Sequence, residues 1–235
     1  MSVKSFVKKL ILKERASSGA YVEYLRNKGV RIGERVIIYA PTKTIIDETR
    51  PWLVEIGNDV KITSGVTILT HGYDWSVLAG LHDEVLGSSG KVTIGNNVFI
   101  GMNSTILKGV SIGNNVIIGA NSLVNKDVPD NVVVAGNPAK IITTVDEYYK
   151  KRKNAQKQEA IELYKNYVEV YGKEPNKEVF SEFFWLFQTK DEAMPNVFKW
   201  QMSHHGREEE TVNNLYKCKP EFNGYNDFLE YLRNS

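Results

Sequence analysis

The chain has 235 residues, of which 42% are hydrophobic and 25% are charged, proportions typical of folded domains and not of disordered or collagen-like chains. Its 30 Lys and Arg residues against 28 Asp and Glu residues leave a formal charge of +2, which provides no global attraction for nucleic acid or an anionic membrane. No apolar run reaches the roughly 20 residues that span a bilayer. The single cysteine, Cys218, excludes an internal disulfide, and we expect a cytoplasmic protein without a signal peptide or membrane insertion.

The N-terminal segment predicts short helices. Residues 2–26 mix apolar side chains with spaced lysines and arginines, the pattern of one or two amphipathic helices. We expect residues 1–29 to form a helical cap on the repeat that follows, because a stack of parallel strands needs a cover over its open edge.

The middle of the chain carries a repeat with a period of six residues. The aliphatic positions of its six units are Ile94, Ile100, Ile106, Ile112, Ile118 and Val124. Small or β-branched residues stand four positions after each, namely Val98, Ser104, Val110, Val116, Ser122 and Val128. Residue types that tolerate the positive φ of a sharp corner stand three positions after each, namely Asn97, Asn103, Gly109, Asn115, Asn121 and Asp127. A corner in every unit turns the chain around a polygon, so the repeat predicts an all-β solenoid.

The same register occurs upstream. Its aliphatic and corner positions are Ile56, Asp59, Ile62, Gly65 and Ile68, and Ile32 with Val36 resembles a degenerate earlier unit. We therefore expect a solenoid over residues 30–145, interrupted by a loop at 71–91 where function is expected. A β-sandwich is disfavoured, because it requires alternating faces and a turn signal every 8 to 12 residues.

The composition changes at residue 146, and residues 146–235 predict a helical extension. A first helix is expected up to Gly172 and Pro175, a second from about residue 176 to 186, and a third over about 227–232. The aromatic residues of this extension, including Trp185 and Trp200, are interpreted as core or subunit contacts rather than as a ligand cage.

Residues 54–142 resemble the hexapeptide-repeat acyltransferases, above all the sugar O-acetyltransferases and the xenobiotic acetyltransferases. The stretch that carries the resemblance is VTIGNNVFIGMNSTILKGVSIGNNVIIGANSLVNKDVPDNVVVAGNPAKII. The resemblance implies a left-handed parallel β-helix, a homotrimer with each active site between neighbouring subunits, and acetyl-CoA as co-substrate without a metal.

His71 follows Ile68 at a corner position, just before the predicted loop. From spacing alone, a histidine tolerated at a left-handed corner and a general base are equally good interpretations. The resemblance implies the second, in which His71 deprotonates an acceptor that attacks the acetyl thioester directly, a role worth roughly 10² to 10⁴ in rate. A covalent route is not expected, because the only thiol lies in the C-terminal extension.

The resemblance also implies the acceptor and donor contacts. The acceptor residues would be Asp74, Trp75 and Phe99, the last standing where many sugar acetyltransferases have tryptophan. The donor residues would be Gly119 and Ala120 beside the pantetheine, Asn137 and Pro138 at the adenine, and Lys126 and Lys140 near the phosphates. Taken without the resemblance, the lysines are ordinary solvated side chains and the small residues ordinary corner geometry.

The function expected from these residues is acetyl-CoA-dependent O-acetylation of a saccharide, such as a surface polysaccharide or lipopolysaccharide unit or its precursor. Alternatives are O-acetylation of an antibiotic, N-acetylation of a nucleotide aminosugar, and a non-enzymatic hexapeptide scaffold. A γ-type carbonic anhydrase would need three histidine ligands, whereas only His71 and His82 lie in or near the repeat. His204 and His205 lie in the C-terminal extension, where surface exposure is expected.

Overall fold

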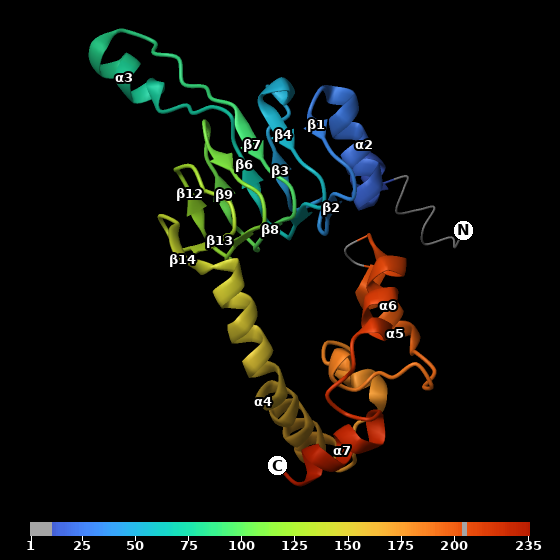
Figure 1. Cartoon of the computed structure of the whole chain (residues 1–235). Helices are drawn as coiled ribbons and strands as arrows, with labels where there is room; N and C mark the ends of the chain where they lie inside the picture. Colours follow the sequence, from blue (N-terminus) through green and yellow to red (C-terminus); the bar gives the residue numbers. More distant parts are fainter. Residues whose placement is uncertain (1–10, 204–205) are drawn as a thin grey trace. The chain divides into compact units, whose positions relative to one another are not determined.

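The computed structural model describes residues 11–203 and 206–235. The chain divides between Tyr148 and Tyr149 into two compact units, a β-strand unit and a helical unit (Figure 1). The part of the N-terminal helix prediction that covers residues 2–10, and the exposure predicted for His204 and His205, lie outside the described residues.

The first unit contains three sheets that the chain visits in rotation. Up to β12 each sheet takes every third strand, and β13 and β14 then extend the second sheet, so that the orders are β1–β4–β7–β10, β2–β5–β8–β11–β13–β14 and β3–β6–β9–β12. The strands are β1 (Arg31–Ile32), β2 (Ile37–Ile38), β3 (Ile45–Ile46), β4 (Val54–Ile56), β5 (Lys61–Ile62), β6 (Thr67–Ile68), β7 (Val92–Ile94), β8 (Val98–Ile100), β9 (Thr105–Ile106), β10 (Ser111–Ile112), β11 (Val116–Ile118), β12 (Leu123–Val124), β13 (Val132–Ala135) and β14 (Lys140–Thr144). All pairings are parallel except that of β13 with β14.

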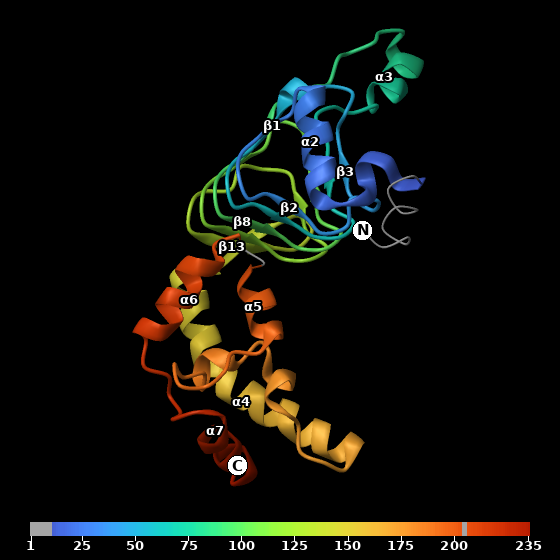
Figure 2. The same cartoon turned by 90° about the vertical axis from the view of Figure 1, so that its right-hand side faces the viewer.

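The predicted aliphatic positions form the core of this unit. Ile94 pairs with Ile112 and Ile100 with Ile118, so one turn of the chain through the repeat takes 18 residues. Each repeated aliphatic residue stacks on its equivalent in the next turn and is buried. Figure 2 shows these successive turns lying over one another. The six-residue period therefore predicts both the parallel pairing and the core.

The corners follow the prediction except at Asp127 and His71. Asn97, Asn103, Asn115 and Asn121 have φ between 55° and 58°, and their neighbours carry ladders of amide hydrogen bonds from turn to turn. Asp127 was expected at a corner but does not have a positive φ. Its carboxylate accepts the Ser111 N–H at 2.7 Å instead, which holds the last turn against the preceding one.

Helix α2 (Ser18–Lys28) packs against the first turn of the strand unit. A short helix, η1 (Lys13–Ala16), precedes it, and the Ser17 hydroxyl accepts the Ala20 N–H at its N-terminus. Tyr21 and Leu25 of α2 are fully buried in the same core as the strands. A second short helix, η2 (Pro51–Leu53), lies between β3 and β4.

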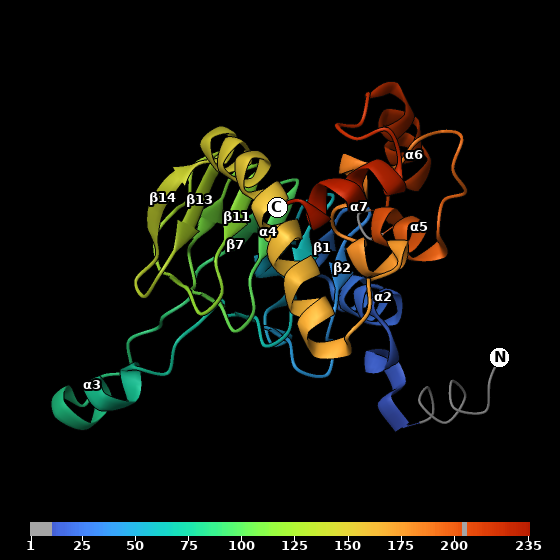
Figure 3. The same ribbon diagram turned by 90° about the horizontal axis from the view of Figure 1, so that it is seen from below.

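The predicted loop at 71–91 contains a helix that the sequence analysis did not anticipate, α3 (Trp75–His82). Figure 3 shows it standing away from the strands. Its apolar residues Val77 and Leu81 are exposed, so no burial pattern stabilises it within one chain. Its eight residues give too weak a periodic signal for prediction.

The helical unit differs from its prediction in the middle. Helix α4 (Val145–Tyr171) stops before Gly172, which has φ of 62°, and α7 (Tyr225–Arg233) contains the third predicted helix. The second predicted helix is wrong, because that stretch forms only two short 3₁₀ turns, η3 (Lys177–Phe180) and η4 (Phe184–Leu186). Helices α5 (Asn196–Ser203) and α6 (Glu208–Lys217) were not anticipated.

Aromatic rings dominate the core of the helical unit. Phe180, Phe187, Phe198 and Phe228 are fully buried, with ring centroids 4.7 to 6.4 Å apart where they touch. The rings of the 3₁₀ segment point into this cluster from irregular backbone, which explains why helical spacing failed to describe it. In the described part of the chain no helix combines the length and apolarity needed to cross a membrane.

Candidate active site

His71 lies three residues beyond the end of β6, at the base of the arm that carries α3. Its backbone is not in the left-handed region, so the interpretation of His71 as a tolerated corner residue is wrong. The residue instead forms an isolated bridge with Ser89, at the point where the arm returns to the strands. Its Nδ1 atom lies 2.7 Å from Oδ2 of Asp47, and 11% of its side chain is exposed.

Asp47 is held by five hydrogen bonds. Its Oδ1 accepts the N–H and hydroxyl of Thr49 at 2.9 and 2.7 Å. Its Oδ2 accepts the Thr70 N–H at 3.2 Å and the Thr70 hydroxyl, in addition to His71. Burial by itself raises the pKa of this carboxyl, but the hydrogen bonds from Thr70, Thr49 and His71 outweigh it and hold the pKa well below its usual range.

The ionised carboxylate selects the tautomer of the histidine. A carboxylate only accepts hydrogen bonds, so Nδ1 of His71 must donate its proton to Asp47. The neutral ring then carries a lone pair on Nε2. This arrangement can take a proton from a hydroxyl placed at Nε2 and can stabilise the positive ring that results.

Asp47 is a site residue that the six-residue pattern does not mark. The signal is in the strand register, because Ile46 pairs with Ile68 and Asp47 donates its N–H to the Ile68 carbonyl. Asp47 therefore lies in the turn of the repeat next to the one that leads from β6 to His71. In this register Asp47 stands opposite Leu69, two positions before His71, but the first turn departs from the six-residue period, so the period does not reveal the pairing.

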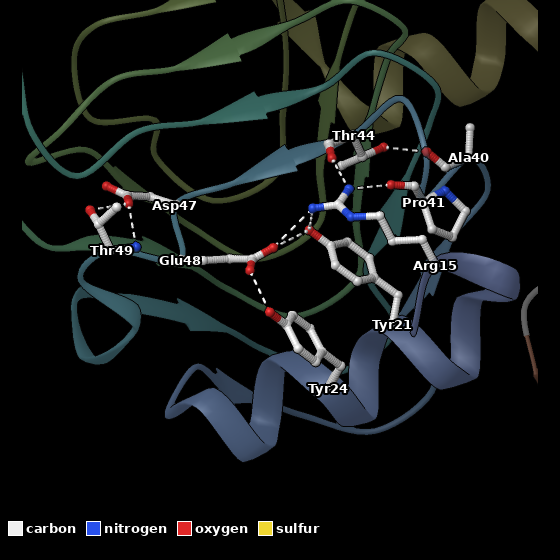
Figure 4. Close-up of polar contacts among 9 residues, drawn as sticks. All are labelled: Arg15, Tyr21, Tyr24, Ala40, Pro41, Thr44, Asp47, Glu48 and Thr49. Carbon is white, nitrogen blue, oxygen red and sulfur yellow. Dashed lines mark hydrogen bonds and ion pairs between the residues drawn. The ribbon is translucent and has the colours of Figure 1, made fainter. Parts of the chain in front are cut away.

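A second polar cluster fixes the segment that carries Asp47 (Figure 4). Arg15 donates to the carbonyls of Pro41 and Thr44 at 2.5 and 2.9 Å, and to the carboxylate of Glu48 at 2.9 Å. The hydroxyls of Tyr21 and Tyr24 donate to the same carboxylate at 3.2 and 2.8 Å.

Burial raises the pKa of Tyr21 to about 12, which keeps this donor protonated. Helix α2 thus reaches the residue that follows Asp47, which ties the N-terminal cap to the candidate site.

The aromatic residues of the arm lie next to the imidazole. Tyr73 meets His71 edge-on with centroids 5.0 Å apart, and Trp75 meets Tyr73 at 6.2 Å. Asp74 is exposed, and its side chain forms no hydrogen bond or ion pair with any described residue. The carboxylate that contacts His71 is therefore Asp47 rather than Asp74. The predicted acceptor residue Phe99 lies elsewhere, half-exposed on the outer face of β8 between Lys61 and Ile117.

The predicted donor residues gather around the last turn. Ser104 and Ser122 both donate to the Gly119 carbonyl, at 2.9 and 2.6 Å. A Cβ at Gly119 would lie 2.8 Å from the Ala135 side chain, so coil packing by itself accounts for the glycine. Ala120 follows at the exposed corner.

Asn137 and Pro138 form the exposed turn between β13 and β14, joined by a cis peptide bond. This turn lies beside β12, because Leu123 donates to the Gly136 carbonyl and accepts from Ala139. Lys126 borders a small cavity of about 50 Å³. Lys140 begins β14 and is exposed.

The proposed donor residues on either side of β12 lie at opposite ends of sheet β3–β6–β9–β12. Gly119 and Ala120 precede β12, whereas Lys126 follows it. Because Val124 pairs with Ile106 and Ile106 with Ile68, His71 lies at the same end as Lys126, two turns away. Adjacent parallel strands are about 4.8 Å apart, so this separation is about 10 Å along the stack.

The remaining histidine and cysteine of the described residues stand apart from the site. His82 is exposed at the end of α3, and Cys218 is exposed in the helical unit. Among the residues that the structure describes, no group of three or more His, Cys, Asp or Glu side chains is arranged to hold a metal ion.

Comparison with known proteins agrees with the repeat. Residues 91–126 match the family described as bacterial transferase hexapeptide (six repeats). Protein CapG of Staphylococcus aureus is 47% identical over 124 residues, 53% of this chain and 71% of CapG. The galactoside O-acetyltransferase of Escherichia coli (strain K12) is 40% identical over 108 residues, 44% of this chain and 49% of that protein.

A solved structure, the maltose O-acetyltransferase from Clostridium difficile 630, is 26% identical, covers 60% of this chain and 81% of that chain, and has a TM-score of 0.40. On the strength of the sequence relatives, this chain belongs to the bacterial hexapeptide-repeat transferases and is an acyltransferase.

Proposed function

We propose that the protein transfers an acetyl group from acetyl-CoA to a saccharide hydroxyl, with His71 as the general base. The observation that carries the proposal is the pair formed by His71 and the buried, ionised Asp47. Similarity to a galactoside O-acetyltransferase supports the choice of a saccharide.

In the proposed reaction, Nε2 of His71 removes the proton of the acceptor hydroxyl as its oxygen attacks the thioester carbon. The carbon–oxygen bond forms, and the carbon–sulfur bond breaks as the tetrahedral intermediate collapses. The thiolate of CoA then takes the proton from His71, which restores the neutral ring. Asp47 keeps Nδ1 protonated throughout and stabilises the intermediate imidazolium.

The proposed donor contacts are those that the family resemblance implies. Gly119 and Ala120 would pass the pantetheine, Asn137 and Pro138 would meet the adenine, and Lys126 and Lys140 would pair with the phosphates. Asp74, Trp75 and Phe99 remain the proposed acceptor residues, the first two at the start of α3 on the arm that follows His71.

The proposed assembly is a homotrimer of left-handed β-helices. Support comes from the placement of the site, since the glycine–alanine corner and His71 lie at opposite ends of sheet β3–β6–β9–β12 within one chain. In a site between two copies, the His71 end of this sheet in one copy would face the glycine–alanine corner of the neighbouring copy. The exposed apolar residues of α3 would then be covered by the neighbouring copy.

The test is release of free CoA thiol with defined acceptors. The panel contains a methyl galactoside, maltose, a nucleotide-linked aminosugar, chloramphenicol and L-serine, each with acetyl-CoA. The proposal expects turnover that is highest with one of the two neutral sugars. Turnover confined to chloramphenicol or to the aminosugar would replace the saccharide O-acetyltransferase assignment. If acetyl-CoA itself fails to raise the melting temperature, the donor assignment is wrong.

A further inference from the structure

A cleft of about 590 Å³ lies within the helical unit, apart from the candidate active site. Three segments form it: the first half of α4, the η3–η4 stretch and the chain after α6. Its volume falls within the range of about 300 to 1,000 Å³ that small-molecule sites occupy. All of its lining residues belong to the helical unit, so the cleft is complete within that unit.

Two aromatic rings face the cleft with much of their surface open. Trp185 is 38% exposed and Tyr149 is 61% exposed, although both are large rings that folding ordinarily buries. Phe183 and Leu186 of the same lining are buried and form an apolar floor. The Trp185 ring packs at a tilt against Phe184, with centroids 6.0 Å apart, which anchors the indole and leaves its remaining surface free.

The polar groups of the lining are of both kinds, donors and acceptors. Gln156, Glu182 and Lys219 line the cleft, and their side chains form no hydrogen bond or ion pair with any described residue. A glutamine amide offers two donor hydrogens and one acceptor oxygen, a carboxylate only accepts and an ammonium only donates. These three groups together match a ligand whose own groups both donate and accept.

The other charged groups of the cleft are already paired. Arg152 forms two hydrogen bonds of 2.6 Å with Glu159, and Glu221 accepts from Lys157 at 2.7 Å. Lys153 lies over the Tyr149 ring at 5.9 Å. A phosphate-bearing ligand requires several converging cations without competing carboxylates, whereas this lining includes Glu182 and Glu221. The charge balance therefore favours an uncharged ligand.

We propose that this cleft binds a neutral saccharide, with a pyranose face on Trp185 or Tyr149 and hydroxyls on Gln156, Glu182 and Lys219. The C–H groups of a sugar face are weakly positive and pack on the negative face of an aromatic ring. A hydroxyl both donates and accepts, which suits the mixed set of free polar groups. The inference rests on the proposed function, because the sugar bound in the cleft would be part of the saccharide acceptor. It would be a different sugar residue from the one that is acetylated.

The experiment is isothermal titration of the full chain, without acetyl-CoA, with maltohexaose, hexa-N-acetylchitohexaose and a β-1,4-galactan hexaose. At least one should bind with a Kd of about 1 mM or tighter. Trp185→Ala should weaken that binding by tenfold or more, and Glu182→Ala by a smaller factor. Trp200→Ala is the matched control, because Trp200 is an exposed tryptophan of the same unit outside the cleft lining. Unchanged melting temperatures would show that the variants fold.

Three results overturn the proposal: no heat with any of the three sugars up to about 10 mM, equal affinity in wild type and Trp185→Ala, or saturable binding of inorganic pyrophosphate in place of the sugars. The result is independent of the proposed function, because binding is read without turnover. Sugar acetylation with normal binding by Trp185→Ala would reject the cleft and keep the reaction. Binding that depends on Trp185 in a protein that acetylates no sugar would keep the cleft and reject the proposed reaction.

Discussion

The two units of this chain are built on different physical rules. In the strand unit most core side chains are aliphatic, and those of the repeat recur every six residues and pair with their equivalents in the neighbouring turn. In the helical unit the core is a cluster of aromatic rings drawn from helices and irregular turns, with contacts at several angles. The first rule is periodic and local, whereas the second exists only once the unit has closed around the rings.

The difference also separates the chemistry. The strand unit gives a frame in which the segments that follow β3 and β6 hold the Asp47–His71 pair. The helical unit has no comparable buried ionised pair among its described residues, but it leaves open aromatic surface and unpaired polar groups. We therefore expect catalysis to respond to changes in the first unit, and affinity for large acceptors to changes in the second.

His71→Ala is expected to give the largest effect. Removal of the proposed base should lower kcat by roughly 10² to 10⁴ while acetyl-CoA binding stays unchanged. Steady-state kinetics and a thermal-shift titration with acetyl-CoA measure the two quantities. Normal turnover in this variant would remove His71 from the mechanism and with it the functional contrast between the units.

Phe228→Ala tests the independence of the helical unit. Phe228 touches Phe187 and Phe222 with centroids 4.7 and 5.2 Å away, so its truncation should destabilise that unit by about 3 to 5 kcal/mol. Urea denaturation followed by tryptophan fluorescence should show an earlier transition, while acetyl-CoA still stabilises the strand unit. Tyr171→Ala, an exposed aromatic of the same unit, is the control with little change expected. Loss of acetyl-CoA binding in Phe228→Ala would show that the two units fold as one.

Asp47→Asn should lower kcat by roughly 100-fold, because the amide donates where the carboxylate accepted and the histidine adopts the wrong tautomer. Asp83→Asn changes the same charge on the exposed arm, where no effect on kcat is expected. Equal rates in the two variants would show that the contact with His71 does not serve catalysis.

The same variant has a signature in stability. The pKa of Asp47 is lower in the folded protein than the value of about 3.9 for an unfolded aspartate. Its ionised form therefore stabilises the fold above that pH, and this contribution is lost as pH falls toward the folded-state pKa. Urea denaturation at pH 6 and at pH 3 should show that the free energy of unfolding falls less between these pH values in Asp47→Asn than in the wild type.

Lys126→Ala addresses the donor end of the strand unit. A charge-assisted bond to a phosphate contributes about 1.5 to 3 kcal/mol, so CoA should bind about 10- to 100-fold more weakly. The affinity for dephospho-CoA, which lacks the 3′-phosphate, should fall much less. Lys43→Ala, an exposed turn lysine away from the last turn, is the matched control. Equal losses for the two ligands would place Lys126 away from that phosphate.

Substitutions of Asn115 are expected to give the smallest effect, and they test what stabilises the corners of the repeat. Asn115 has φ of 55° and donates from its side chain to Asn131 at 2.8 Å. Asn115→Ala should cost about 1 to 2 kcal/mol, because an alanine pays the full penalty of a left-handed corner. Asn115→Gly removes the same amide and tolerates the backbone, so it should cost less. The reverse order would mean that the amide ladder, and not the corner, stabilises the turn.

The sequence by itself determined the repeat, its core and most of its corners. An aliphatic residue in every sixth position and an asparagine or glycine three places later specify parallel stacking, because each contact depends only on the neighbouring turn. Through its family resemblance the repeat also predicted an acyltransferase, which the sequence relatives confirm. Asp127 departed from the pattern, because hydrogen bonding to the preceding turn replaced the corner there.

Only the tertiary structure decided the rest. Asp47 and His71 are 24 residues apart, and they meet because two turns of unequal length stack in register. The aromatic cluster and its cleft depend on segments from α4 to α7 that no local period links. Contacts between distant residues carry no periodic signal in one sequence, so the partner of the histidine and the interior of the helical unit appear only when the chain is folded.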